Sequence, residues 1–351
     1  MRDLNRLIDA VQRNCHIADA RHARGATLCT YLLEMREYYR WENDLPHGEP
    51  PPKAELGVWL TAREALWEGL EDEPFAELPV GGALLDAFDA QAVNARLMPR
   101  GFIYGGGYGR FHRPHFFLAE LDRTERRDGI TVLLAGCEYA RDLSAPPAVL
   151  HEGMVYLRQE SVRRWLQEKV ELWGMRKTDG ALASAMERYG FPGDRAQALE
   201  RMTLEQTEAI ILHEVGEGLA GDLLGAPWQA MLAGLTRRRA ELVARAVRDN
   251  LADCASTLPA LIAAGAEASI HFYFANFEGM RRALFPRLDQ GYQRWREDGD
   301  IADLAEAVRS GRAHWEAAGR RLLEIYRESA AGCGDGMLDA RIASEEPALT
   351  L

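Results

Sequence analysis

The stretch TLEQTEAIILHEVGEGLAGDLL, residues 203–224, predicts a helix that carries charged side chains within an apolar run. Thr203 followed by Gln206 fits the capping box that begins many helices. Gly225 and Pro227 lie just beyond the stretch and are typical of a helix end. Its apolar residues recur every three or four positions, which favours burial of one face. We therefore take this helix as the element around which the fold is organised.

Three ionisable residues of this helix form the strongest functional pattern in the chain. His213 and Glu217 are four residues apart, so their side chains lie one turn apart beside the core face. The sequence His-Glu-Val-Gly-Glu resembles the HExxH helix of zinc peptidases, but Glu217 replaces the second histidine. Histidine with a carboxylate remains a ligand pair for zinc, manganese or iron, and Glu214 is the candidate general base. The alternative is a buried polar network that fixes the registry of packed helices.

Two later residues are candidate further ligands of the same metal site. Asp253 lies in a helix predicted over residues 237–264, within the apolar surroundings Leu-Ala-Asp-Cys. His271 follows in SIHFYFANFEGM, a segment rich in aromatic residues. An aspartate on a half-buried helix is more often solvated or paired with arginine, and a histidine among aromatic residues is more often part of the core. The sequence leaves both alternatives open.

The composition is that of a globular protein without a general basic character. The chain has 351 residues, 47% of them hydrophobic, and a net charge of −12. Nucleic-acid binding needs clustered positive charge, so we expect no nucleic-acid partner. No apolar run reaches about 18 residues and the first residues show no signal peptide, so we expect no membrane span and a cytoplasmic location. Five scattered cysteines without a CxxC motif predict reduced thiols.

The N-terminal half predicts helices followed by a small sheet. Apolar residues at helical spacing predict helices over residues 1–23, 27–42, 54–72 and 81–98. Segments rich in Val, Ile, Phe and Tyr, with Asp128-Gly129 as a turn, predict a small antiparallel sheet over residues 115–158. Between them, GFIYGGGYGRFHRPHF at residues 101–116 predicts a glycine-rich loop, and the role of its residues 105–109 stays undetermined.

Two further site hypotheses fall in this half. The glycine-rich loop lacks the GK[ST] ending of a P-loop, but it is followed by basic side chains that form a candidate anion site: Arg110, His112, Arg113 and His115. The other hypothesis is a dinuclear-iron, oxidase-like site between the first two helices, with candidate residues His16, Asp19, His22, Glu34 and Glu37. The Glu-x-x-His element typical of such sites is absent, and the helical period rotates His22 away from His16.

After residue 161 the helical period returns and continues. It predicts helices over residues 161–173, 179–189, 195–200, 204–224, 228–233, 237–264, 267–283, 286–297 and 301–328. Pro259 is expected to kink or end the helix that contains it. We expect a mainly α fold of two helical sets with a small antiparallel sheet near the middle of the chain. The domains predicted are an N-terminal helical domain with the sheet (1–165), an all-helical C-terminal domain (166–328) and a mobile tail (329–351).

These segments together resemble an uncharacterised bacterial family of this length, one of the domains of unknown function. The stretches that carry the resemblance span most of the chain and are HIADARH (16–22), TLCTYLLEMREYYRWE (27–42), GFIYGGGYGRF (101–111), EYARDLSAPPA (138–148), ILHEVGE (211–217), DNLADCASTLPAL (249–261) and HFYFANFEGMRR (271–282). The tail after Ser329 lies outside the resemblance. The resemblance implies no activity, so it adds no catalytic residue.

The sequence therefore leads to one preferred function and two alternatives. The preferred one is a divalent-metal-dependent hydrolase or lyase, with His213, Glu217, Asp253 and His271 as ligands and Glu214 as the base. The first alternative is a non-catalytic scaffold or partner-binding protein that uses the same residues as a polar network. The second is the dinuclear-iron protein. The substrate, the protein partners and the oligomeric state are not determined by the sequence.

Overall fold

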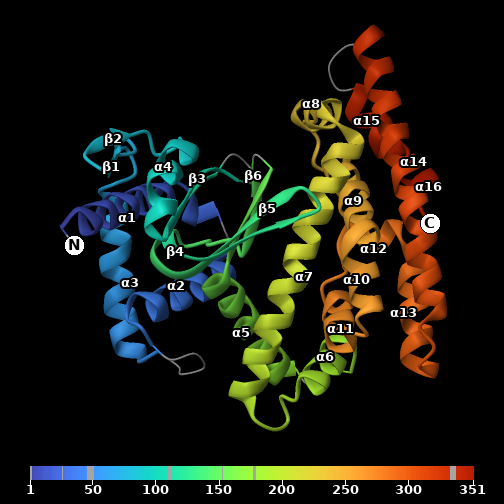
Figure 1. The fold of residues 1–351 in the computed structure, drawn as a ribbon, viewed down its shortest axis with the longest axis horizontal. Helices are drawn as coiled ribbons and strands as arrows, with labels where there is room; N and C mark the ends of the chain where they lie inside the picture. Colours follow the sequence, from blue (N-terminus) through green and yellow to red (C-terminus); the bar gives the residue numbers. More distant parts are fainter. Residues whose placement is uncertain are drawn as a thin grey trace. The chain divides into compact units, whose positions relative to one another are not determined.

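The fold is described from a computed structural model of the chain (Figure 1). The structure describes residues 2–25, 27–45, 51–109, 113–151, 153–176, 179–332 and 337–351. The chain is mainly α-helical, as predicted, and divides into two compact units. Unit 1 comprises residues 1–125, 131–149 and 156–169, and unit 2 comprises residues 126–130, 150–155 and 170–351. The boundary predicted at residue 165 falls within helix α5 (Gln159–Arg176), which contributes to both units.

Unit 1 combines helices with a two-stranded sheet and most of a larger sheet, whose residues 126–130 and 150–155 are assigned to unit 2. Its helices are α1 (Arg2–His22), η1 (Ala23–Gly25), α2 (Leu28–Glu42), α3 (Lys53–Glu68), α4 (Ala90–Leu97) and η2 (Met98–Arg100). A two-stranded antiparallel sheet pairs β1 (Leu78–Val80) with β2 (Ala83–Leu85). The larger sheet has the strand order β3-β4-β5-β7-β6, and its strands are β3 (Phe102–Tyr108), β4 (Pro114–Arg127), β5 (Ile130–Arg141), β6 (Ala148–His151) and β7 (Met154–Arg158).

The larger sheet differs from the small antiparallel sheet predicted over residues 115–158. It is a mixed sheet of five strands, and the glycine-rich segment predicted as a loop is its strand β3. Gly105 pairs with Phe117, and a Cβ at Gly105 would lie 2.1 Å from the Phe117 ring. A Cβ at Gly106 would lie 2.3 Å from the carbonyl oxygen of Ala87. These glycines therefore allow close packing on both faces of a strand.

Residues 81–98 do not form the single helix predicted there. Gly81 and Gly82, with φ values of 58° and 82°, make the turn between β1 and β2, a conformation that two-residue hairpin loops require. Helix α4 begins only after Asp89, whose side chain accepts a hydrogen bond from the amide of Ala92. The apolar residues of this segment resemble one helical stripe, but the two glycines divide them between a hairpin and a short helix.

Unit 2 is built from helices around one apolar core. They are α6 (Ala181–Tyr189), α7 (Arg195–Leu224), α8 (Ala226–Gly234), α9 (Arg238–Ala252), the π-helical segment η4 (Asp253–Thr257), α10 (Leu258–Ala263), α11 (Glu267–Ala275), α12 (Gly279–Leu284), α13 (Pro286–Asp298), α14 (Ala302–Gly332), α15 (Met337–Ser344) and α16 (Glu346–Leu349). Helix α9 lies beside both of the long helices α7 and α14 (Figure 1). Large side chains such as Trp228 and Trp315 are fully buried in this core.

Helix α7 is longer than the sequence predicted. The two helices expected over residues 195–200 and 204–224 form one helix, which is capped by Asp194 rather than by Thr203. The Thr203 hydroxyl lies inside the helix and donates a 2.7 Å hydrogen bond to the carbonyl oxygen of Leu199. A threonine whose hydroxyl donates to the carbonyl four residues earlier can lie inside a helix, so Thr203 does not mark the helix start.

The helix predicted over residues 237–264 is interrupted, as expected for a segment that contains Pro259. Helix α9 ends at Ala252, and η4 then makes a π-helical turn in which the amide of Leu258 donates to the carbonyl oxygen of Asp253, five residues earlier. Pro259 lies at the start of α10, where the missing proline N–H leaves no hydrogen bond unmade.

The segment predicted as a mobile tail, residues 329–351, contains the end of α14 and helices α15 and α16. Asp339 accepts hydrogen bonds from the amides of Thr236 (3.0 Å) and Arg237 (2.7 Å), and Ile342 and Leu349 are buried. Helices this short give a weak periodic signal and are stabilised by packing rather than by their own propensity.

No helix formed by the described residues is long and apolar enough to cross a membrane. Cys15, Cys137 and Cys254 carry free thiols, and Cys333 lies outside the described residues.

Candidate functional site

The charged cluster predicted in unit 2 forms where α7 packs closely against the end of α9. Gly216 permits this approach, because a Cβ at that position would lie 2.5 Å from the carbonyl oxygen of Ala252. The contact brings the His213 turn of α7 next to η4, which begins at Asp253. Single π-helical turns are frequent at functional sites. The glycine of His-Glu-Val-Gly-Glu is therefore a packing residue that lets the charged residues meet.

His213 and Asp253 form the centre of the cluster. The Nδ1 atom of His213 lies 2.8 Å from Oδ1 of Asp253, and Asp253 is only 1% exposed. The other carboxylate oxygen of Asp253 accepts hydrogen bonds from the Tyr273 hydroxyl (2.9 Å) and from Arg281. The His213 side chain keeps 27% of its surface exposed, and its Nε2 lies 3.6 Å from Oε1 of Glu217. The imidazole is thus held by Asp253 through Nδ1, and its Nε2 faces the Glu217 carboxylate.

Arginines neutralise the carboxylates around His213. Glu217 accepts a 2.7 Å hydrogen bond from Arg248, which also lies 3.1 Å from Asp249. Arg281 neutralises Asp253. The local spacing of the chain pointed to acidic residues of this cluster but to neither arginine, because a basic residue that pairs across helices has no spacing signal of its own. The apolar context of Arg248 in Ala-Val-Arg-Asp was the one local sign of partial burial.

The cluster shifts the pKa values of its members in different directions. Burial disfavours the charged imidazole, but the Asp253 and Glu217 carboxylates overcome it and raise the pKa of His213 well above its ordinary value. Burial opposes ionisation of Asp253, but Arg281 and His213 hold its pKa at about 2. Burial, reinforced by the Glu217 charge, raises the pKa of Glu214 to about 7. At neutral pH, His213 therefore holds a proton while Glu214 is close to half ionised.

His271 does not join this cluster. Its Nδ1 lies 3.0 Å from the Tyr292 hydroxyl, and its ring stacks on Trp295 with 4.7 Å between the ring centroids. Burial, with the nearby Arg188 and Arg296, lowers its pKa to about 4. His271 is a core histidine, because none of its hydrogen bonds or ring contacts reaches His213 or Asp253. Throughout the described part of the chain, no group of three or more His, Cys, Asp or Glu side chains is placed to hold a metal ion.

Three of the five residues proposed for a dinuclear-iron site in unit 1, His16, Asp19 and Glu37, meet separate partners. Arg63 lies 2.9 Å from Nε2 of His16, and burial together with this guanidinium lowers the pKa of His16 to about 3. Glu37 is buried and pairs with Arg40 at 2.6 Å. Asp19 accepts hydrogen bonds from a backbone amide. Because each of these groups already has its own partner, they do not form one ligand set.

The candidate anion site lies only partly within the described residues. Arg110 and His112 fall outside them. His115 places Nδ1 3.1 Å from Oδ2 of the buried Asp142, and the carbonyl oxygen of Arg113 accepts a hydrogen bond from Gly109. The described part of this segment therefore continues the β3–β4 pairing.

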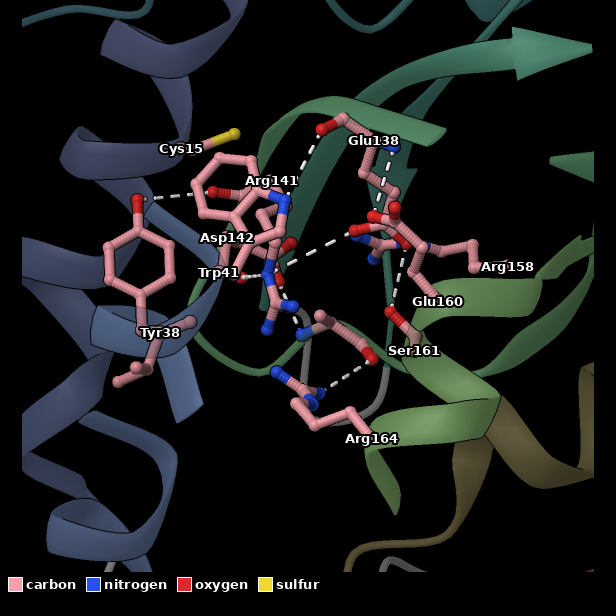
Figure 2. A network of polar contacts seen from close by, with 12 residues as sticks. Cys15, Tyr38, Trp41, Glu138, Arg141, Asp142, Arg158, Glu160, Ser161 and Arg164 are labelled. Carbon is pink, nitrogen blue, oxygen red and sulfur yellow. Dashed lines mark hydrogen bonds and ion pairs between the residues drawn. The ribbon is translucent and has the colours of Figure 1, made fainter. Parts of the chain in front are cut away.

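Unit 1 contains a second, more deeply buried polar network (Figure 2). Arg158 on β7 makes two hydrogen bonds to the Glu138 carboxylate on β5, at 2.9 and 2.7 Å, and both side chains are almost fully buried. The Ser161 hydroxyl donates to the same carboxylate at 3.0 Å, and Glu160 accepts from the amide of Glu138. These contacts join two neighbouring strands to the start of α5, so the network has a structural role.

Models of a known protein family match residues in both units of the chain. The N-terminal domain of a family of unknown function (DUF6866) matches residues 6–158, and the C-terminal domain of the same family matches residues 163–344. No curated protein and no solved structure matches the chain. The resemblance to a domain of unknown function is thereby confirmed: the chain belongs to the DUF6866 family.

Proposed function

We propose that unit 2 carries a proton-transfer site for hydrolytic chemistry on a small-molecule substrate, with His213 as the general acid and Glu214 as the general base. The observation that carries this proposal is the 2.8 Å contact between His213 and Asp253. A buried carboxylate that holds one imidazole nitrogen orients the ring and leaves the other nitrogen for proton exchange. The His213 side chain is 27% exposed, and the proposal requires that a substrate reach its Nε2 beside Glu217.

The two roles follow from the two protonation states. His213 keeps its proton at neutral pH because of the adjacent carboxylates, so it can donate one to a leaving group. Glu214, with a pKa of about 7, can accept a proton from an attacking water molecule. Neighbouring titratable groups in different protonation states are typical of an acid–base pair in enzymes.

The first test uses two esters that differ in their leaving group, 4-nitrophenyl acetate and phenyl acetate. Glu214→Gln is expected to slow turnover of both by about 10²–10⁴-fold, the usual contribution of a general base. His213→Gln is expected to slow phenyl acetate more, because the poorer leaving group needs a proton. Wild-type turnover should rise with pH through about 7, as Glu214 loses its proton, and fall again where His213 loses its own.

The matched control for this test is His151→Gln, which changes an exposed histidine on β6 and is expected to leave turnover unchanged. Melting temperatures report whether each variant is folded. Wild-type protein that shows no turnover above the rate in buffer, or folded Glu214 and His213 variants that match wild type, would contradict the proposal. The non-catalytic scaffold would then be the better explanation of the same network.

A divalent metal held by His213 and Glu217 is the second candidate. The observation that favours it is the 3.6 Å separation of Nε2 and Oε1, which is compatible with one zinc ion at about 2 Å from each atom. Against it, Glu217 is already paired with Arg248, and Asp253 already accepts three hydrogen bonds. The described residues therefore fit an ion-pair network better than a complete metal site.

If His213 and Glu217 hold a divalent metal, protein purified without a histidine tag is expected to contain one equivalent of zinc, manganese or iron. His213→Ala should abolish that binding, and a chelator should lower the melting temperature, because bound metal stabilises the folded state by mass action. The measurement is elemental analysis combined with thermal melting. Metal-free protein that melts identically with and without each added ion would contradict the metal candidate without affecting the proton-transfer proposal.

A further inference from the structure

Three basic residues of unit 1, which we call the basic corner, gather where α1 ends and β4 begins. They are His22, the last residue of α1, and Arg113 and His115 of the segment predicted as a candidate anion site. A Cβ at Gly25 would lie 2.8 Å from Nη2 of Arg113, so this guanidinium lies against the turn that follows His22. The Gly109 amide donates to the carbonyl oxygen of Arg113, and a Cβ at Gly109 would lie 2.6 Å from Cδ2 of His115. The two glycines therefore leave room for these basic side chains.

The guanidinium of Arg113 has unused hydrogen-bond donors. Arg113 is half-buried, and within the described part of the chain its side chain makes no hydrogen bond and no ion pair. Arg21 differs, because it donates to the carbonyl oxygens of Glu71 and Glu73. A cation that is partly removed from water without a counter-ion is unfavourable. The planar fork of guanidinium donors matches the oxygens of a phosphate or a carboxylate, so an oxyanion would satisfy it.

The two histidines of the basic corner also have nitrogen atoms without a partner. His115 is held through Nδ1, 3.1 Å from the Asp142 carboxylate, and its Nε2 has no partner among the described residues. His22 makes no hydrogen bond or ion pair with any described residue. The charges that act on His22 are those of Arg113, Arg21 and His115, and all are positive. Like charges therefore gather here, although the chain as a whole has a net charge of −12.

The carboxylate beside His115 does not neutralise the rest of the corner. Asp142 is 1% exposed, and it also accepts hydrogen bonds from the amides of Phe116 (3.1 Å) and Ala145 (2.6 Å). Burial opposes its ionisation, but the contact with His115 holds the pKa of Asp142 below the ordinary value. An imidazolium with this carboxylate on one side and an anion on the other donates from both nitrogens. Asp142 thus orients His115 and leaves Nε2 for a ligand.

Glu34 on α2 is a further carboxylate whose charge interacts with that of Arg113. It is half-buried, and no described residue forms a hydrogen bond or an ion pair with it. Burial raises the pKa of Glu34 to about 6, although Arg164 and Arg113 act in the opposite direction. Glu34 therefore does not serve as the counter-ion of Arg113.

We propose that the basic corner binds the phosphate group of a small phosphorylated molecule, with Arg113, His22 and Nε2 of His115 as the donors. A phosphate monoester has three terminal oxygens and a charge of about −1.5 to −2 at pH 7, so it can accept from three donors at once. A carboxylate has only two oxygens and one charge. The proposal concerns unit 1 alone and is independent of the proton-transfer site in unit 2.

The protonation of His22 agrees with this assignment. Burial, together with the charges of Arg113, Arg21 and His115, lowers the pKa of His22. A bound phosphate adds negative charge beside the ring and favours its protonated form. Phosphate binding is therefore expected to raise the pKa of His22.

The first test is calorimetric titration of the full chain, at about pH 6.5 and constant ionic strength, with inorganic phosphate, glycerol phosphate and acetate. We expect both phosphates to bind at one site and acetate to bind at least ten-fold more weakly. Arg113→Gln is expected to weaken phosphate binding at least ten-fold. The matched control is Arg6→Gln, which removes an exposed arginine of α1 about 24 Å along the helix from His22 and should leave binding unchanged.

A second variant moves the guanidinium without removing its charge. The backbone of Gly25 lies outside the left-handed region, so Gly25→Val is expected to keep the melting temperature near that of wild type. Its side chain would occupy the space of the Arg113 guanidinium, and phosphate binding should weaken several-fold.

Four results would overturn the proposal. One is the absence of phosphate binding at about 10 mM, where a site of millimolar Kd is filled. Another is equal affinity for acetate and phosphate, and a third is an equal loss for Arg113→Gln and Arg6→Gln. The fourth comes from sedimentation with phosphatidylcholine vesicles that contain phosphatidic acid: binding to these vesicles without binding of free phosphate would assign the corner to a lipid surface instead.

Histidine NMR gives a readout that a structural role of His22 would not change. The pKa of His22 is measured with and without saturating inorganic phosphate, and His22→Gln assigns the resonance. We expect phosphate to raise this pKa, and an unchanged value in the phosphate-bound protein would contradict the role of His22 as a donor.

Discussion

Asp253→Ala is expected to destabilise unit 2 by about 3–5 kcal/mol, the usual result of removing one partner of a buried ion pair. The Asp253 carboxylate is 1% exposed and neutralises both His213 and Arg281. Without it, the Arg281 guanidinium loses its carboxylate partner, His213 loses the main group that raises its pKa, and the Tyr273 hydroxyl loses its acceptor. Urea unfolding followed by tryptophan fluorescence and circular dichroism measures the loss in free energy of unfolding.

The pH dependence of this loss gives a second readout. The folded-state pKa of Asp253 is about 2, below the ordinary value of about 3.9 for an aspartate. A depressed pKa stabilises the folded state above the ordinary value, and this stabilisation disappears as the pH falls towards the folded-state pKa. The difference between wild type and Asp253→Ala should therefore shrink as the pH is lowered from about 4 to about 2.

The control for this prediction is Asp249→Ala, because Asp249 is more exposed and pairs with Arg248, which also pairs with Glu217. Its loss is expected to stay below about 1 kcal/mol, as for most partly exposed ion pairs. Equal losses for the two variants, or a loss below about 1 kcal/mol for Asp253→Ala, would contradict the central position given to Asp253.

Arg158→Met is expected to destabilise unit 1 by about 3–5 kcal/mol, because it leaves a buried carboxylate without its principal counter-ion. The Glu138 side chain is 0% exposed and accepts two hydrogen bonds from the Arg158 guanidinium (Figure 2). After the substitution the Ser161 hydroxyl remains as an uncharged donor, and the Arg141 guanidinium remains 4.0 Å from the carboxylate without a hydrogen bond to it. The loss is measured by urea unfolding, with the circular dichroism of the β-sheet as the signal.

The double variant Arg158→Met, Glu138→Leu distinguishes two contributions to the free energy of unfolding: the penalty for an unpaired buried charge and the net stabilisation by the ion pair. Replacing both charges by apolar groups of similar volume is often nearly neutral, so the double variant is expected to recover much of the loss. The control is Arg309→Met, which removes one partner of the exposed pair with Glu306 and should cost less than about 1 kcal/mol. A double variant no more stable than Arg158→Met would contradict this account of the network.

Local patterns predicted those elements whose residues alternate between core and solvent with a regular period. The first helix, expected over residues 1–23, is α1 (Arg2–His22), and its apolar residues Leu7 and Val11 are buried. Strand β3 was not predictable in this way, because Gly105 has no side chain to show an alternation. Its place in the sheet depends on the Phe117 ring of the neighbouring strand, which occupies the space that a larger residue would need.

The same division applies to the candidate site. The sequence by itself placed His213 and Glu217 on one face of a helix, because four residues complete about one helical turn. Only the tertiary structure decided what they meet. Asp253 reaches His213 from 40 residues away along the chain, through the close approach of two helices at Gly216, and Arg281 reaches Asp253 from 28 residues away. Packing between distant segments of the chain determines such partners. The residues next to a buried carboxylate in the sequence therefore do not show which cationic side chain will neutralise it.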